Sequence, residues 1–237
     1  MTERYVPAAG RRAFTRLYDP VVALTMREDT FRDRLRAQVL DGLEPGGDVV
    51  DVGCGTGTTA IALAAAGADV IGVDGDPEVL AIAHAKPGAD AVQWRKGTAT
   101  ALPIAGESAD RVVMSLLLHH LGDEAKRTAL AEAQRVLRAG GRLHVADWGR
   151  PRGALPRAGA WLLARVDDAA SLREHHAGGL ADVIAASGLA DVTVRGRLQT
   201  AWGTLELLSA RRPWTPNSSR SAAEMAPPGR SRRFPSR

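Results

Sequence analysis

The sequence predicts an α/β fold in which a doubly wound, mainly parallel sheet carries helices on both faces. Short runs rich in Val and Ile alternate five times with helical runs rich in Ala and Leu, which is the rhythm of consecutive β–α units. The first strand-like run leads into three glycines at alternate positions and then directly into a helix. Turns of this kind bind ligands at the carboxyl edge of parallel sheets.

The expected strands and helices follow, in chain order, from the pattern of apolar residues and from the residues that begin and end helices. The five expected strands cover 48–53, 69–76, 91–97, 109–117 and 142–148. Between them, helices are expected over 58–67, 77–85 and 123–141, the last with acidic residues first, basic residues late and glycine at its end. After residue 148 the rhythm changes. Two helical patterns, 161–172 and 178–188, precede two strands, 191–199 and 203–210, that are close enough to pair antiparallel.

Composition indicates one domain with a basic tail. The 237 residues carry a net charge of +4, but residues 211–237 hold seven Arg and one Glu, so residues 1–210 carry a net −2. We expect three parts: a helical N-terminal segment over 1–45, a globular domain over 46–210, and a disordered tail over 211–237. Cys54 is the only cysteine, and neither a secretion signal nor an apolar run of about 18 residues is present. A cytoplasmic protein without a membrane segment is expected.

The residues of the glycine loop restrict which class of ligand it can bind. A dinucleotide-binding loop needs its third glycine at position 58, which is Thr58, and no Gly-Lys-Ser/Thr of a phosphate-binding loop follows. Two carboxylates remain, Asp51 before the loop and Asp74 at the end of the second strand. A carboxylate at the second position accepts from ribose hydroxyls, and one beside the loop suits a cationic amino-acid group. Ribose with such a group describes S-adenosylmethionine (SAM).

Four blocks carry a family resemblance: "VVDVGCGTG", "VIGVDGDPEVLAIA", "ATALPIAGESADRVVMSLLLHHL" and "AEAQRVLRAGGRLHVADW". In order and spacing they resemble the class I SAM-dependent methyltransferases, most closely the small-molecule branch with the ubiquinone/menaquinone-type enzymes. The likeness is close over about residues 45–150. It implies a Rossmann-like sheet of seven strands whose last strand is antiparallel, and an acceptor lid formed by residues 1–45 and an insertion over about 149–190.

The resemblance also implies a set of residues that bind the cofactor. They form the glycine loop, the ends of the second and fourth strands and the turn after the third: Asp51, Gly53, Cys54, Gly55, Gly57, Asp74, Gly75, Asp76, Thr98, Ala99, Ser115 and Leu116. One position departs from the family, since Thr98 stands where an Asp often accepts from the adenine amine. We expect the Thr98 hydroxyl, backbone or water to accept there instead.

Residues for the acceptor side follow the fourth and fifth strands. His119 and His120 come at the end of the fourth strand, where an imidazole can act as a base near neutral pH; closing the loop is the alternative role. Asp147 either orients an acceptor or caps the following loop. Tyr18 and Trp148 are candidates for the acceptor pocket, with plain packing as the alternative. No histidine has the spacing of a metal ligand, so no metal is expected.

The predicted function is transfer of a methyl group from SAM to a small organic acceptor by in-line displacement, with S-adenosylhomocysteine (SAH) as product. A SAM-dependent cyclase or decarboxylase and a non-catalytic SAM-binding module stay open as alternatives. Nucleic acid is disfavoured as a partner, because "MSLLLHHLGD" follows the fourth strand where an Asn/Asp-Pro-Pro-Tyr/Phe motif would stand. The sequence leaves a monomer and a homodimer open.

Overall fold

A computed structural model of the chain describes residues 28–149, 179–200 and 203–214. Its strands are β1 (Asp48–Val52), β2 (Asp69–Asp74), β3 (Val92–Lys96), β4 (Ala109–Ser115), β5 (Leu137–Gly149), β6 (Ala190–Gln199) and β7 (Thr204–Arg211). Its helices are α2 (Glu28–Leu40), α3 (Thr58–Ala65), α4 (Pro77–His84), α5 (Asp123–Val136) and α8 (Leu180–Ala186), with short 3-10 turns η1 (Ala89–Ala91) and η2 (Leu118–His120).

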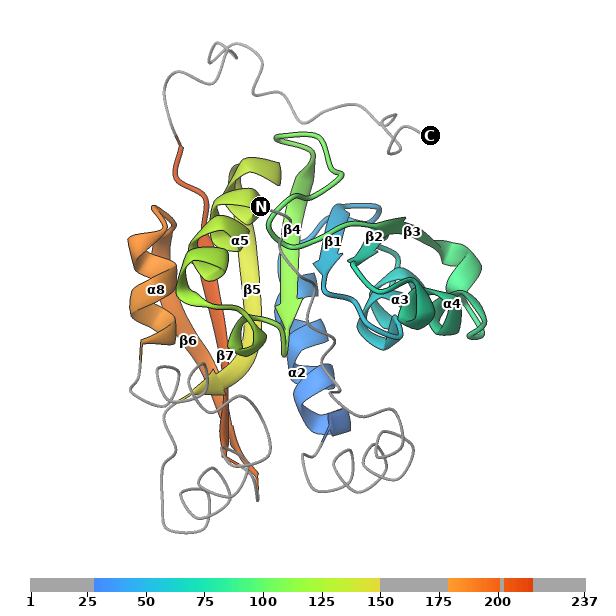
Figure 1. Cartoon of the computed structure of the whole chain (residues 1–237), viewed down its shortest axis with the longest axis horizontal. Coiled ribbons are helices and arrows are strands. Elements are labelled where there is room, and N and C mark those ends of the chain that lie inside the picture. Colours follow the sequence, from blue (N-terminus) through green and yellow to red (C-terminus); the bar gives the residue numbers. More distant parts are fainter. Residues whose placement is uncertain (1–27, 150–178, 201–202, 215–237) are drawn as a thin grey trace.

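These strands form one seven-stranded sheet in the order β3-β2-β1-β4-β5-β7-β6. The first five pair in parallel, while β7 runs antiparallel to both β5 and β6. Figure 1 shows α4 beside β3 at one edge of the sheet and α8 beside β6 at the other. The predicted α/β class, the parallel sheet and the antiparallel ending are confirmed.

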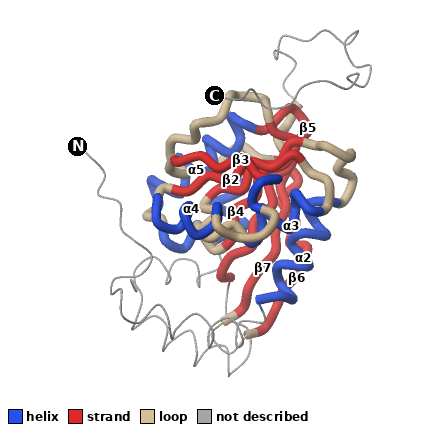
Figure 2. Tube along the Cα trace, turned by 90° about the vertical axis from the view of Figure 1, so that its right-hand side faces the viewer, coloured by secondary structure: helices blue, strands red, loops and turns tan. Residues whose placement is uncertain are grey.

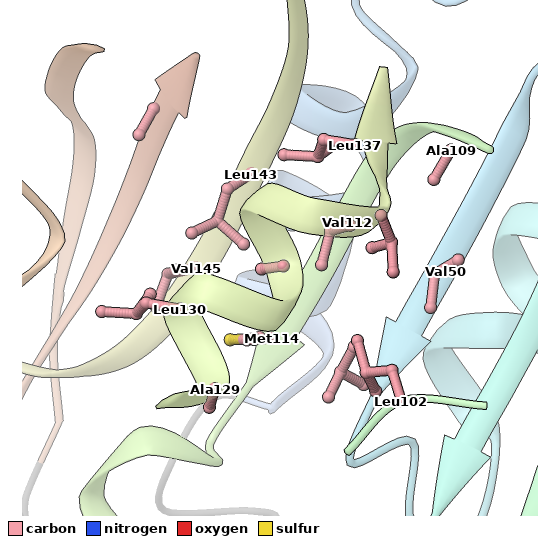
Figure 3. Packing of buried hydrophobic residues seen from close by; sticks show 14 of the residues in the cluster. Val50, Leu102, Ala109, Val112, Met114, Ala129, Leu130, Leu137, Leu143 and Val145 are labelled. Carbon is pink, nitrogen blue, oxygen red and sulfur yellow. The ribbon is translucent and has the colours of Figure 1, made fainter. Parts of the chain in front are cut away.

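Two apolar clusters cover the two faces of the sheet. Helices α5 and α8 pack on one face, where Leu130 and Ala129 of α5 lie over Met114 and Val145 (Figure 3). On the other face, α2 and α3 lie next to each other beside the strands (Figure 2). Helix α2 buries three large apolar side chains there, so it belongs to the core of the domain: Phe31, Leu35 and Val39.

The predicted end of the helix over 123–141 is wrong, because α5 ends at Val136. The carbonyls of Arg135 and Val136 accept hydrogen bonds from the amides of Glu107 and Ser108 at 3.0 and 2.9 Å. Leu137 already pairs with Ala109 of β4. Carbonyls at the helix end thus find donors in a distant loop, and the chain enters β5 without a glycine cap.

Arg135 fastens a loop to α5. Its guanidinium donates to the carbonyls of Leu102 and Ile104 at 3.2 and 2.9 Å and to both oxygens of Glu132. One of these oxygens also accepts from the Leu102 amide at 2.8 Å. We expect Arg135→Ala to lower the free energy of unfolding by about 1–2 kcal/mol, measured by urea denaturation. The exposed Arg127 on the same helix supplies the control, Arg127→Ala. Equal stability of the two variants would show that the fastening contributes nothing.

Candidate functional site

The glycine loop joins β1 to α3 and is tied to the end of β2. The amides of Gly53 and Cys54 both donate to the carbonyl of Val73, at 2.8 and 3.1 Å. The loop glycines Gly53, Gly55 and Gly57 all have positive φ angles, of 67°, 52° and 77°. A Cβ at Gly55 would meet nothing within 4 Å, so the loop opens toward free space there.

The ring of Trp94 packs against the glycine loop. A Cβ at Gly57 would lie 2.3 Å from the Trp94 ring, and a Cβ at Gly72 on β2 would lie 2.6 Å from the same ring. The indole nitrogen donates to the carbonyl of Ala89 at 3.0 Å, which fixes the ring in place. Two glycines are therefore required by packing against one aromatic side chain, while Gly55 faces open space.

Cys54 fills space inside the same loop. Its side chain is buried, and its sulfur would lie 3.2 Å from a Cβ at Gly72. Burial, followed by the charges of Asp51 and Asp74, raises the pKa of the thiol far above its usual value. The thiol is protonated and unreactive at neutral pH, so Cys54 acts through its size.

Asp74 joins the glycine loop to the turn before α4. One carboxylate oxygen accepts from the amide of Gly55 at 2.8 Å, and the other accepts from the amide of Asp76 at 2.9 Å. Each oxygen of an ionised carboxylate has a second lone pair, and the side chain is half-buried. Asp74 is thus held in one orientation and retains acceptor capacity for a pair of hydroxyl groups.

Asp51 carries a buried carboxylate at the end of β1. It is 1 % exposed, and neither carboxylate oxygen has a hydrogen-bond partner among the residues that the structure describes. Burial raises the pKa of Asp51 to about 7. The positive charge of Arg32 on α2 and the nearby backbone amide of Ala60 oppose this shift, and the negative charge of Asp74 adds to it. Burying an unpaired carboxylate is costly, so a cationic ligand group is the natural complement to this position.

The turn before α4 and the turn after β3 lie next to Asp74 and form one rim of the site. Asp76 caps α4 by accepting from the amide of Glu78 at 2.8 Å, beside the half-buried Gly75. The amide of Gly97 donates to the carbonyl of Asp74 at 3.0 Å, which brings Thr98 and Ala99 to this rim. Thr98 is exposed, and its hydroxyl lies 3.2 Å from that of Thr100.

Asp147 organises the end of β4. It is fully buried, and one oxygen accepts from the amides of Leu118 and His119 at 2.8 and 3.3 Å. The other accepts from the amide of Trp148 and from Nδ1 of His119, both at 2.7 Å. His119 is 7 % exposed, and its ring lies 3.8 Å, centroid to centroid, from that of the exposed His120. The carboxylate therefore fixes both the η2 turn and the His119 ring.

Two predicted cofactor residues lie directly before this turn. Ser115 ends β4, and Leu116 has a φ of 52°, in the left-handed region that side chains rarely adopt. The Leu116 amide donates to the carbonyl of Ala146 at 2.8 Å, which holds the turn. Non-glycine residues in such conformations cluster at functional sites.

Other predicted positions lie elsewhere. Trp148 is 4 % exposed and packs in the core cluster on the α2 side, which leaves it little surface for an acceptor. Tyr18, most of the segments 1–45 and 149–190, and residues 215–237 lie outside the described residues. The sequence reasoning missed Trp94 and Arg32, and no pattern in a single sequence marks either of them.

Within the described part of the chain, no group of three His, Cys, Asp or Glu side chains gathers as metal ligands would. The same part of the chain contains no helix that is both long and apolar enough to cross a bilayer.

The part of the chain that holds this site is similar to known methyltransferases. The family model described as a methyltransferase domain matches residues 49–141. A demethylmenaquinone methyltransferase of Renibacterium salmoninarum is 40 % identical over 121 residues, which cover 50 % of this chain and 49 % of that protein. This match thus spans about half the relative's length. The predicted resemblance to SAM-dependent methyltransferases of the menaquinone type is confirmed.

Solved structures confirm the Rossmann-like fold. The crystal structure of YcgJ from Bacillus subtilis has a TM-score of 0.62 at 20 % identity, over 78 % of this chain and 98 % of that chain. A phosphoethanolamine N-methyltransferase of Haemonchus contortus, crystallised with phosphomonomethylethanolamine and SAH, has a TM-score of 0.60 at 17 % identity. That match covers 76 % of this chain and 53 % of the Haemonchus chain.

Proposed function

We propose that this chain transfers a methyl group from SAM to a small organic acceptor by in-line displacement. The observation that carries the proposal is the buried carboxylate of Asp51, whose oxygens have no hydrogen-bond partner among the described residues, next to a glycine loop that opens to free space at Gly55. A methyltransferase domain over residues 49–141 and the 40 % identity to a demethylmenaquinone methyltransferase support it.

The residues around the loop fit the proposed cofactor. Asp51 would pair with the cationic amino group, and Asp74, with its remaining lone pairs, would accept from the ribose hydroxyls. The turns at Gly75–Asp76 and Thr98–Ala99 would hold the adenine. The family resemblance places Ser115 and Leu116 beside the methionine portion. When bound, SAM supplies a methyl group on a positively charged sulfur that is open to attack by a nucleophile.

The chain's own contribution is mainly to position the reactants, which in favourable cases lowers a barrier by roughly 7–11 kcal/mol. Asp147 serves this purpose, since its four hydrogen bonds fix the η2 turn at the end of β4. For acceptors that must lose a proton, we assign the base to His119. A carboxylate at Nδ1 fixes the ring tautomer, so that Nε2 is the nitrogen that would accept the proton.

The first experiment is calorimetric titration of the full chain with SAM and SAH. Wild type is expected to bind both, and Asp74→Asn to bind at least about tenfold more weakly, because one charge-assisted acceptor is lost. The exposed Asp90 supplies the control, Asp90→Asn, which should keep wild-type affinity. No binding of either ligand by wild type would contradict the proposed cofactor.

Turnover separates the proposal from its two alternatives. The protein is incubated with methyl-labelled SAM and a panel of quinols, phenols and amines, and products are analysed by mass spectrometry. A product that gains one methyl group together with release of SAH supports methyl transfer. Conversion of an acceptor without gain of a methyl group would favour a SAM-dependent enzyme of another type, and binding without any turnover would favour a SAM-binding module.

A further inference from the structure

A second concavity lies on the α2 side of the sheet. Its volume is about 530 Å³, within the range of sites that hold small organic molecules. Helix α2 and strands β5, β6 and β7 form its walls through Arg34, Ala37, Gln38, Asp41, Arg142, His144, Arg195, Gly196 and Leu207. None of these residues belongs to the proposed cofactor site.

The position of the pocket separates it from the glycine loop. His144 pairs with Val113 of β4, and Val113 pairs with Asp51 of β1, so two strand spacings of together about 10 Å lie between His144 and Asp51. Helix α2 contacts both α3 and β5. The helix therefore stands between the loop side of the sheet and this pocket.

Positive charge gathers around the pocket. Three guanidinium groups line it, those of Arg34, Arg142 and Arg195, against the single carboxylate of Asp41. Arg34 is exposed and Arg142 is half-buried, and neither side chain takes part in the hydrogen bonds or ion pairs found among the described residues. Arg195 donates through Nε to the Ser209 hydroxyl at 2.9 Å, which anchors the side chain and leaves its terminal nitrogens for a ligand. The lining therefore carries a net charge of about +2.

His144 is a buried residue of this lining, and one of its ring nitrogens has no hydrogen-bond partner among the described residues. The amide nitrogen of Gln38 donates to the carbonyl of Leu208 at 2.8 Å, which identifies it as the NH₂ group, and it also lies 3.0 Å from Nδ1 of His144. Nδ1 is consequently the acceptor, and the ring proton lies on Nε2. His144 is 2 % exposed, and Nε2 has no partner among the described residues.

The imidazole is neutral, so it offers a hydrogen bond and not a charge. Burial is the largest cause that lowers the pKa of His144, to about 3, and the positive charges of Arg111, Arg142 and Arg195 lower it further. A buried donor without an acceptor costs about 1–3 kcal/mol. An anion in the pocket would offset the surrounding positive charge.

We propose that this pocket binds a small phosphorylated molecule, whose phosphate oxygens accept from the guanidinium groups of Arg142 and Arg195. Forked guanidinium donors match the geometry of phosphate oxygens. The volume leaves room for an organic part beside the phosphate. This inference does not depend on methyl transfer, because the pocket shares no residue with the proposed cofactor site.

The test is calorimetric titration of the full chain with pyrophosphate at constant ionic strength. Wild type is expected to bind it, and Arg142→Ala and Arg195→Ala each to bind at least about tenfold more weakly. Arg127→Ala, on exposed α5 surface, should bind like wild type. Thermal unfolding of every variant confirms that it is folded.

Three results would overturn the proposal. They are no pyrophosphate binding by wild type, an equal loss in Arg127→Ala, and retained affinity in both arginine variants of the pocket. A short single-stranded oligonucleotide is titrated in parallel. If it binds more tightly than pyrophosphate with the same dependence on Arg142 and Arg195, the surface recognises nucleic acid and the small-molecule proposal is wrong.

Discussion

Asp51→Asn is expected to raise the stability of the ligand-free protein at about pH 8 and to weaken SAH binding about a hundredfold. Both effects come from one observation, the buried carboxylate of Asp51 whose oxygens have no partner in the described structure. The loss of affinity follows because the variant cannot pair with a buried cationic group of the ligand. Truncating one side of such a pair costs about 2–5 kcal/mol.

The sign of the stability change follows from the pKa of Asp51. Burial raises it from 3.8 to about 7, so the folded state holds a proton that the unfolded state releases between these values. The free energy of unfolding of wild type therefore falls as pH rises from about 4 to about 7, by about 4 kcal/mol in total. Asn cannot ionise, so the variant lacks this decline. Because its amide is also buried, the net gain expected near pH 8 is about 2 kcal/mol.

Urea denaturation at about pH 4.5 and at about pH 8 measures this effect. The gain should be absent at the lower pH, where the carboxyl of Asp51 is protonated and neutral. Asp90→Asn, at an exposed position, should change stability by less than about 0.5 kcal/mol at both. If Asp51→Asn is less stable than wild type near pH 8, the fold itself stabilises the carboxylate, and the site does not need a cationic ligand group.

Binding supplies an independent readout for the same residue. Because the ligand's cationic group pairs with the ionised form of Asp51, the affinity of wild type for SAH should fall as pH drops below about 7. The affinity of Asp51→Asn should not show this fall. Parallel pH profiles of the two proteins would place the cationic group somewhere else.

The fold could be predicted from the sequence because its signals are local. Alternating strand and helix runs define a parallel sheet, and the two strands near the C-terminus are close enough in sequence to pair with each other. The end of α5 could not be predicted, because its last carbonyls bind the amides of Glu107 and Ser108, about 28 residues earlier. Such partners leave no trace in a helical pattern.

Part of the candidate site could likewise be predicted from the sequence, and part could not. The glycine loop and the two carboxylates, Asp51 and Asp74, stand in a recognisable spacing. From the sequence, Asp147 could either orient an acceptor or cap the following loop. Only the fold shows that it accepts from the amides of Leu118 and His119. Trp94 reads as an ordinary strand residue, although it dictates glycine at position 57. Contacts between distant segments decide these roles, and single-sequence patterns do not contain them.

Gly55→Ala is expected to weaken cofactor binding strongly while leaving most of the protein folded. Gly55 has a φ of 52°, and a Cβ built there meets nothing within 4 Å. The methyl group would project into the open space of the loop, where the proposed ligand must approach the backbone. We expect SAH affinity to fall at least about a hundredfold, because a rigid overlap with a bound ligand cannot be relieved by a side-chain rotation.

The matched control is Gly67→Ala, because it separates backbone strain from blocked space. Gly67, after α3, has a φ of 93°, and a Cβ there also meets nothing within 4 Å. Both variants should lose about 1–2 kcal/mol of stability from the left-handed backbone. Only Gly55→Ala should lose SAH affinity, as measured by calorimetry below the unfolding temperature of both proteins. If both variants bind SAH like wild type, the space beside Gly55 is not where the cofactor lies; if both lose affinity equally, backbone strain and not occupied space is the cause.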